Sequence, residues 1–218
     1  MARKLTATIV DVSTEYQGFL TVRRYEIEED CHAGGRQRVV RFVMERGHAV
    51  GVLAFDPRRD VVVLANEMRP GILAAGGPAF SDSLIAGVID ADETALSAAV
   101  RETREEAGLE LRTPRVIHER AYVSPGGTSE SITLVYGTVT APQTSTVHGN
   151  ADEGENIRTV LVSSRQLMNR IRRGEVQDMK TMLAGYWLMA NRARLRREHA
   201  SGTESAASGA AEAPPRGP

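Results

Sequence analysis

Two neighbouring stretches decide the fold of this chain: Gly87-Val88-Ile89-Asp90-Ala91-Asp92-Glu93 and, seven residues further on, Arg101-Glu102-Thr103-Arg104-Glu105-Glu106-Ala107-Gly108-Leu109. Glu102, Glu105 and Glu106 are spaced i, i+3 and i+4, so a helix places all three carboxylates on one face. Like charges at this spacing repel by roughly 0.2–0.5 kcal/mol per pair. We therefore expect positive charge beside them, either from Arg101 and Arg104 in a solvated network of ion pairs or from a bound cation.

The residues around this helix favour a bound cation over a network of ion pairs. The sequence predicts a strand, then Gly87 and a tight acidic turn before the helix, with Gly108 as the residue that ends it. Three converging carboxylates without histidine or cysteine form a hard oxygen site, which suits Mg²⁺ or Mn²⁺ rather than Zn²⁺. Such a site would bind a phosphate-containing substrate through the metal.

Working outward, the first half of the chain alternates in short β-branched segments and the second half mixes strands with helices. Residues 13–18 are expected to form a polar turn and residues 71–83 a long flexible loop. The Met179–Met189 stripe is expected to be core or interface rather than a cofactor site. We predict strands at residues 5–10, 20–27, 38–44, 49–55, 60–65, 84–89, 116–122, 132–139 and 157–162, and helices at 92–107, 164–172 and 178–198. Residues 200–218 contain no aliphatic side chain larger than alanine, which predicts a disordered tail.

Composition excludes several classes of protein. The 218 residues carry a net charge of −1 and are 41% hydrophobic and 25% charged, as in ordinary globular proteins. This balance gives no support for nonspecific binding to nucleic acid or to membrane surfaces. The one cysteine, Cys31, excludes an internal disulfide framework and a multi-cysteine zinc site, so a reducing, cytoplasmic location is the default expectation. We find no segment long and apolar enough to predict a membrane span, no nucleophile–His–Asp pattern and no phosphate-binding loop followed by Lys-Ser/Thr.

The spacing Gly87-x5-Glu93-x7-Arg101-Glu102-Thr103-x-Glu105-Glu106-x-Gly108-Leu109 resembles the Nudix box at every defining charged and glycine position. Thr103 is a mild departure, because the pattern prefers an aliphatic residue there. The resemblance implies a hydrolase of nucleoside diphosphates linked to another moiety.

Over roughly residues 16–187 the chain is similar to the bacterial ADP-ribose pyrophosphatases, through residues 16–19, 45–49, 55–57, 124–130 and 148–158. This resemblance implies an α+β fold, in which a Nudix α/β/α sandwich follows a small N-terminal antiparallel sheet. That sheet is expected to be exchanged across a homodimer, with the substrate between the subunits. The implied division is a dimerisation domain at residues 1–46, a Nudix domain at 47–199 and the tail at 200–218.

The resemblance also implies the catalytic residues. Glu102, Glu106, Glu155 and the backbone carbonyl of Ala86 are expected to hold Mg²⁺, with Mn²⁺ as the other candidate. Glu153 is expected to be the catalytic base, on an acidic loop that composition alone describes as a solvated loop. Glu105 and Arg101 belong to the same catalytic group, in which Arg101 is expected to pair with Glu93 across the turn.

Substrate contacts follow in the same way. Arg69 and Arg41 are expected to approach the nucleotide, and Phe19 is expected to stack on adenine. Without the resemblance, the two arginines could equally be surface residues and Phe19 a residue of a small satellite core. Gly127 and Glu130, in a stretch that is otherwise an ordinary turn, are expected to line the second ribose. Ser83 departs from the relatives, which often have glutamate there, so the sugar specificity stays open. The alternatives are another nucleoside diphosphate sugar, such as GDP-mannose or UDP-glucose, and a non-catalytic module that binds ADP-ribose.

Overall fold

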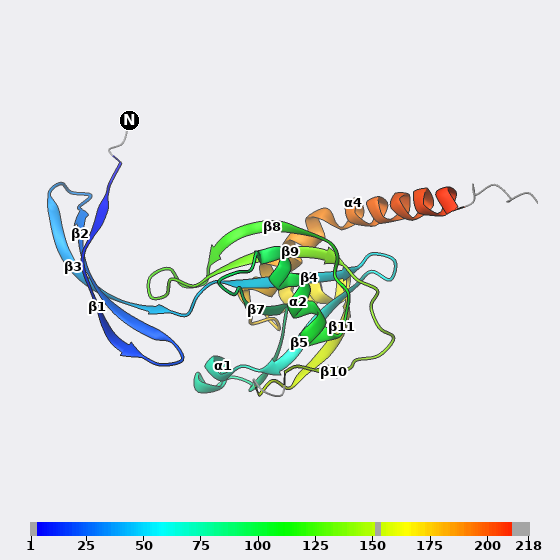
Figure 1. Ribbon diagram of the computed structural model, residues 1–218, viewed down its shortest axis with the longest axis horizontal. Coiled ribbons are helices and arrows are strands. Elements are labelled where there is room, and N and C mark those ends of the chain that lie inside the picture. Colours follow the sequence, from blue (N-terminus) through cyan, green and yellow to red (C-terminus); the bar gives the residue numbers. More distant parts are fainter. Residues whose placement is uncertain (1–3, 151–153, 211–218) are drawn as a thin grey trace, which may run out of the picture.

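The computed structural model describes residues 4–150 and 154–210, with side chains to residue 201 (Figure 1). The N-terminal part is a three-stranded antiparallel sheet in the order β1-β2-β3. Its strands are β1 (Ala7–Gln17), β2 (Thr21–Asp30) and β3 (Arg36–Glu45). β1 continues through most of the segment predicted as a turn, because residues such as Thr14 and Tyr16 pair with β2, and the turn lies at residues 18–20.

A larger mixed sheet forms the centre of the molecule, in the order β10-β11-β5-β4-β9-β8, with β6 paired to β5 and β7 paired to β4. β4 and β9 are parallel, and the other neighbours are antiparallel. The strands are β4 (Ala49–Asp56), β5 (Val61–Met68), β6 (Phe80–Ser83), β7 (Ile85–Val88), β8 (Arg112–Tyr122), β9 (Ser131–Thr138), β10 (Val147–His148) and β11 (Ile157–Ser163).

Helices cover both faces of this sheet. Alternate residues of β4 face opposite sides, so Val52 packs in one cluster with Ala98 and Ala99 of α2 (Ala95–Ala107). Phe55 packs in a second cluster with side chains of α3 (Ser164–Arg172) and α4 (Met179–Ala210). Figure 1 shows α2 lying over the sheet. The predicted α/β/α sandwich with an N-terminal antiparallel sheet is confirmed.

Two predicted boundaries near the box are wrong. Residues 71–83 are not a continuous loop, because Pro70 begins the short helix α1 (Pro70–Ala74) and the segment then pairs with β5 as β6. The box helix starts at Ala95 rather than at residue 92. Its N-cap is Thr94, whose side chain forms a capping box with Ser97, so a hydroxyl rather than a carboxylate caps the first turn.

The predicted disordered tail is also wrong in part. α4 runs on through residues 200–210, beyond the predicted end at 198, and residues 211–218 lie outside the described residues. Extension of an existing helix adds one hydrogen bond per residue without a new nucleus, and alanine is the best helix former. In the described part of the chain, no helix is long and apolar enough to cross a membrane.

Candidate active site

The turn that leads into α2 is held by Arg101. Its guanidinium donates to both carboxylate oxygens of Glu93, at 3.0 and 2.8 Å, and to the Val88 carbonyl at 3.0 Å. These hydrogen bonds lower the pKa of Glu93. The predicted pairing of Glu93 with Arg101 is therefore present, and it fixes the start of the helix against the end of β7.

Arg101 also serves two of the three box glutamates. Its Nη1 atom donates to Glu102 at 2.7 Å and to Glu105 at 3.0 Å. Arg104, the other predicted source of positive charge, is exposed and acts on Glu110 instead. One guanidinium therefore faces Glu93, Glu102 and Glu105, and the local charge remains negative.

Glu106 lies deepest among the box carboxylates, with 2% of its surface exposed, against 7% for Glu102. Burial and then the nearby charge of Glu67 raise the pKa of Glu106 to about 8, although the Ala86 N–H donates to its carboxylate at 3.2 Å. Burial also raises the pKa of Glu102, against the effect of Arg101. Two buried carboxylates that lack sufficient countercharge are a donor set that fits a divalent cation with oxygen ligands.

Two glycines let this centre form. A Cβ atom on Gly87 would lie 1.7 Å from Oε1 of Glu102, so only glycine lets the carboxylate approach the β7 backbone. Gly108 ends α2 with a φ of 64° in the left-handed region. Thr103 fits its buried position because its hydroxyl donates to the Ala99 carbonyl at 2.7 Å, which satisfies its hydrogen bond within the helix.

The acidic loop contributes Glu155. Its Oε2 atom accepts from the Asn150 N–H at 3.0 Å, and its charge raises the pKa of Glu102 and Glu106. Glu155 thus faces the same centre as the box. Within residues 4–150 and 154–210, no three His, Cys, Asp or Glu side chains already converge as a metal-binding group. Glu153 lies outside the described residues.

A cavity of about 180 Å³ adjoins these carboxylates and brings Ala86, Arg69 and Glu130 together. Arg46 and Lys180 add two further cations to its wall, and both were missed from the sequence. In the sequence, Lys180 is distinguished only by its rarity, since Lys4 and Lys180 are the only lysines in an arginine-rich chain. The remaining lining residues are Gly47, His48, Ala49, Gly87, Val88 and Ile132.

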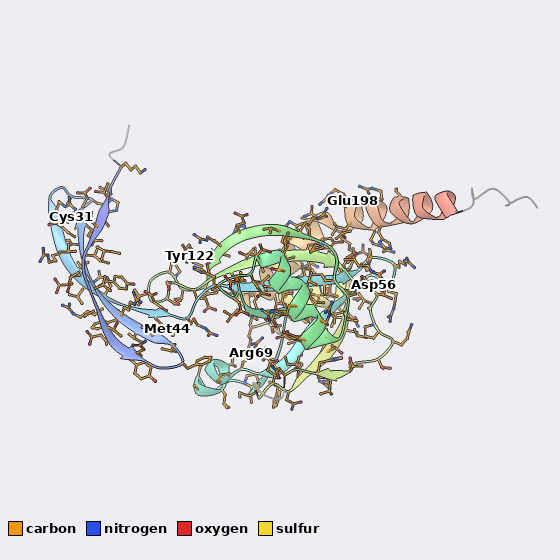
Figure 2. The ribbon with its side chains drawn as sticks, viewed as in Figure 1. Cys31, Met44, Asp56, Arg69, Tyr122 and Glu198 are labelled. Carbon is orange, nitrogen blue, oxygen red and sulfur yellow. The ribbon has the colours of Figure 1, made fainter. Side chains whose placement is uncertain are left out.

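The other predicted substrate residues do not reach this cavity. Phe19 is 97% exposed in the β1–β2 turn, and Arg41 is exposed on β3, where it donates to the Val40 carbonyl. Gly127 instead joins the N-terminal sheet to the rest of the molecule, because its carbonyl accepts from the Met44 N–H at 2.9 Å. Figure 2 shows Met44 at this junction and Arg69 in the central domain.

Buried carboxylates on the helix of a three-layer sandwich, next to a cavity lined by three cations, define an enzyme that handles phosphates. The chain belongs to the Nudix hydrolase family, since the family model described as the NUDIX domain matches residues 45–184.

Several named proteins are similar to this chain in sequence or in fold. An ADP-ribose pyrophosphatase of Escherichia coli (strain K12) is 36% identical over 194 residues, covering 88% of this chain and 92% of that protein. An ADP-ribose pyrophosphatase of Haemophilus influenzae is 34% identical, over 86% of this chain and 88% of its own. A GDP-mannose pyrophosphatase of Escherichia coli O1:K1 / APEC is 30% identical over 146 residues, which cover 66% of this chain and 74% of that protein. The crystal structure of an ADP compounds hydrolase has the same fold, with a TM-score of 0.66 and 20% identity, and covers 87% of this chain and 98% of that one.

Proposed function

We propose that this Nudix hydrolase cleaves the pyrophosphate bond of ADP-ribose, with Mg²⁺ or Mn²⁺, and releases AMP and ribose 5-phosphate. One observation carries the proposal: the carboxylates of α2 and the cationic cavity meet at Ala86 and Gly87. A diphosphate needs both kinds of group, cations for its charge and a carboxylate centre for the metal. Two of the relatives are named ADP-ribose pyrophosphatases, which points to the substrate.

Glu102, Glu106, Glu155 and the Ala86 carbonyl would hold the metal. When bound, Mg²⁺ supplies charge neutralisation for the diphosphate and promotes ionisation of water. Burial of Glu106 supports this assignment, because a dication would offset the burial and the repulsion that together raise its pKa to about 8. Arg101 holds Glu102 and Glu105 in place through hydrogen bonds from its Nη1 atom.

Side chains of the protein would bind the substrate and accept the proton of the attacking water. Arg46, Arg69 and Lys180 bind the two phosphates, and Glu130 accepts from the hydroxyls of the second ribose. Glu153 takes the proton of the attacking water. We assign the protein to the cytoplasm on the strength of its single cysteine.

We further propose that the chain is a homodimer in which the N-terminal sheet, residues 1–46, of one subunit completes the site of the other. Phe19 and Arg41 do not line the cavity of their own subunit, so a second copy would supply them. The sheet exposes large apolar side chains, among them Ile9, Val12 and Phe42. A monomer rarely exposes so many on one small unit.

A different nucleoside diphosphate sugar is the second candidate substrate. The relative named GDP-mannose pyrophosphatase supports it, and so does Ser83, which departs from the ADP-ribose pyrophosphatases. The non-catalytic module is the third candidate, and the presence of every box glutamate argues against it.

The decisive experiment is phosphate release coupled to alkaline phosphatase, with purified protein, Mg²⁺ and ADP-ribose, GDP-mannose, UDP-glucose and diadenosine compounds. The phosphatase acts only on newly exposed phosphomonoesters, so the readout follows cleavage of the pyrophosphate. We expect strong preference for ADP-ribose and a loss of several orders of magnitude in turnover in Glu102→Gln, with an unchanged circular dichroism spectrum. Preference for another substrate would overturn the specificity, and ADP-ribose binding without turnover would identify a non-catalytic module.

A further inference from the structure

Glu67, at the end of β5, is a partly buried carboxylate to which the sequence assigned no role. Its side chain is 19% exposed, and its Oε1 atom lies 2.7 Å from Nη2 of Arg69. Burial raises the pKa of Glu67, while Arg69 acts to lower it. A buried carboxylate without a partner is costly, so the position of Glu67 depends on the guanidinium beside it.

The β5–β6 ladder adds a second anchor for the same arginine. Ala65 pairs with Ser83 and Glu67 pairs with Ser81, so Glu67 and Ser83 project from one face of the sheet as diagonal neighbours. Nη2 of Arg69 donates to Oγ of Ser83 at 2.6 Å. The Ser83 hydroxyl donates onward to the Leu84 carbonyl, which leaves its oxygen free to accept.

These two anchors orient Arg69 where it lines the cavity. Both use Nη2, so they do not consume the donors of Nη1 and Nε, which a phosphate can accept from. A free arginine side chain samples many rotamers, so holding its guanidinium in place before binding reduces the conformational entropy that binding must remove.

The charge of Glu67 also acts on the carboxylate centre. Its pKa responds to Lys180 on α4 and to Glu155 on the acidic loop, and its own charge raises the pKa of Glu106. The charge of Glu67 is therefore coupled electrostatically to α2, α4 and the acidic loop.

We infer that Glu67 is a positioning residue: its carboxylate holds the Arg69 guanidinium in the orientation that binds the substrate diphosphate, and so it sets KM rather than kcat. The inference rests on the proposed function, since it takes the ligand of the cavity to be the diphosphate of ADP-ribose.

A double-mutant cycle tests the inference in the full chain. Glu67→Gln and Arg69→Ala are each expected to raise KM for ADP-ribose about tenfold, with kcat within about threefold of the original. The double variant is expected to be no worse than Arg69→Ala alone, because Glu67 acts through that arginine. Glu110→Gln is the matched control, since Glu110 pairs with Arg112 at the same spacing, at 2.8 Å, but on the surface, and its KM is expected to stay unchanged.

Other outcomes overturn the inference. An unchanged KM in Glu67→Gln would mean that Glu67 does not affect substrate binding. Additive increases in KM in the double variant would mean that Glu67 does not act through Arg69. A fall in kcat alone would place Glu67 at the reacting centre. Thermal unfolding checks that each variant folds. If Glu67→Gln does not, Glu67→Asp keeps the charge but withdraws it from Arg69, and an intermediate KM is expected. If the unmodified protein binds ADP-ribose without turnover, the proposed function fails, and Kd replaces KM in the same cycle.

Discussion

At the scale of single residues, the candidate site depends on how closely a buried carboxylate approaches a backbone. The Oε1 atom of Glu102 lies against Gly87 and also accepts from Arg101. Its neighbour Glu106 is buried further and keeps a raised pKa of about 8. A bound dication would favour the ionised form of these crowded carboxyl groups and, together with the cations of the neighbouring cavity, would neutralise a diphosphate.

Gly87→Ala tests this close approach. The added methyl group would lie 1.7 Å from Oε1 of Glu102, so the carboxylate must move away from the β7 backbone. We expect a stability loss of about 1–3 kcal/mol, as in overpacked cores, and a fall in turnover of about tenfold or more. Chemical denaturation and the phosphate-release assay measure the two effects.

Gly174→Ala is the control for stability alone. Gly174 has a φ of 72° and open space around it, past the end of α3. An alanine there is strained by about 1–2 kcal/mol but touches nothing in the site. Turnover per folded molecule should stay the same; equal losses of turnover in both variants would show that stability, and not the Glu102 contact, explains the Gly87 effect.

At the scale of elements, the turn between β4 and β5 is hydrogen-bonded to both α3 and α4. Asp60, between β4 and β5, accepts from Ser164 at the start of α3 and from Nε and Nη2 of Arg192 on α4, at 2.7 and 2.6 Å. Its φ of 59° is left-handed, a conformation that Asp and Asn tolerate better than most residues. Burial acts to raise the pKa of Asp60, but the hydrogen bonds from Arg192 and Ser164 outweigh it, so the net shift is downward.

Asp60→Asn removes the charge and keeps the backbone preference. We expect it to lower the unfolding free energy at pH 7 by about 2 kcal/mol, the scale of hydrogen bonds to a charged group. A depressed pKa stabilises the fold above the unfolded value of 3.8 and loses that contribution as pH falls through the folded value. The difference between the two proteins should therefore shrink below pH 3.8 in urea titrations.

The control for this pH effect is Glu198→Gln, on the exposed surface of α4. Glu198 pairs with Arg194 one turn away, and exposed pairs of this kind contribute little. Its stability should differ far less from the original at pH 7. A gap for Asp60→Asn that stays constant down to low pH would contradict the role of its charge.

At the scale of the whole molecule, the N-terminal sheet is connected to the sandwich but its predicted substrate residues lie outside the cavity. Backbone hydrogen bonds of Met44 with Gly127 and Ser129 hold the sheet to the central domain. A second apolar surface, with an adjoining cavity of about 280 Å³, includes Tyr122, Met179 and Leu183. Both surfaces favour association of two copies, as the proposed exchange of the sheet requires.

Mixed dimers test whether each site is shared. One subunit carries Glu102→Gln, and the other carries Phe19→Ala with Arg41→Ala. Each homodimer is expected to be nearly inactive, because one lacks a metal ligand and the other lacks the nucleotide contacts. Co-refolding should restore about a quarter of the original activity, since about half of the dimers are mixed and each has one complete site.

Two further outcomes would contradict the shared site. A single-subunit mass in analytical ultracentrifugation would remove the dimer, and a dimer that shows no gain of activity on mixing would mean that each subunit uses its own N-terminal sheet. The gain should also follow the ratio of the two subunits and be greatest when they are equal.

The sequence by itself determined the features that are local. The i, i+3, i+4 glutamates, Gly87 before the helix and Gly108 after it are all set within two dozen residues, where helical periodicity and chain reach leave few alternatives. The Glu93–Arg101 pair, which the family resemblance implied, lies within the same stretch. Most strands and helices also followed from their own apolar periods, whereas the α/β/α sandwich was expected from the resemblance to the Nudix family.

Only the tertiary structure decided which distant side chains meet at the site. Glu67 joins Arg69 and Ser83 because β5 pairs with β6, a segment that the sequence described as a loop. Lys180 reaches the cavity because the first turn of α4 is held to the link between β6 and β7, where the Leu84 N–H donates to Thr181. Arg46 reaches it because Arg46 directly follows the end of β3. Such meetings depend on strand register and helix placement, which are fixed by the burial of the whole core and leave no local pattern to read.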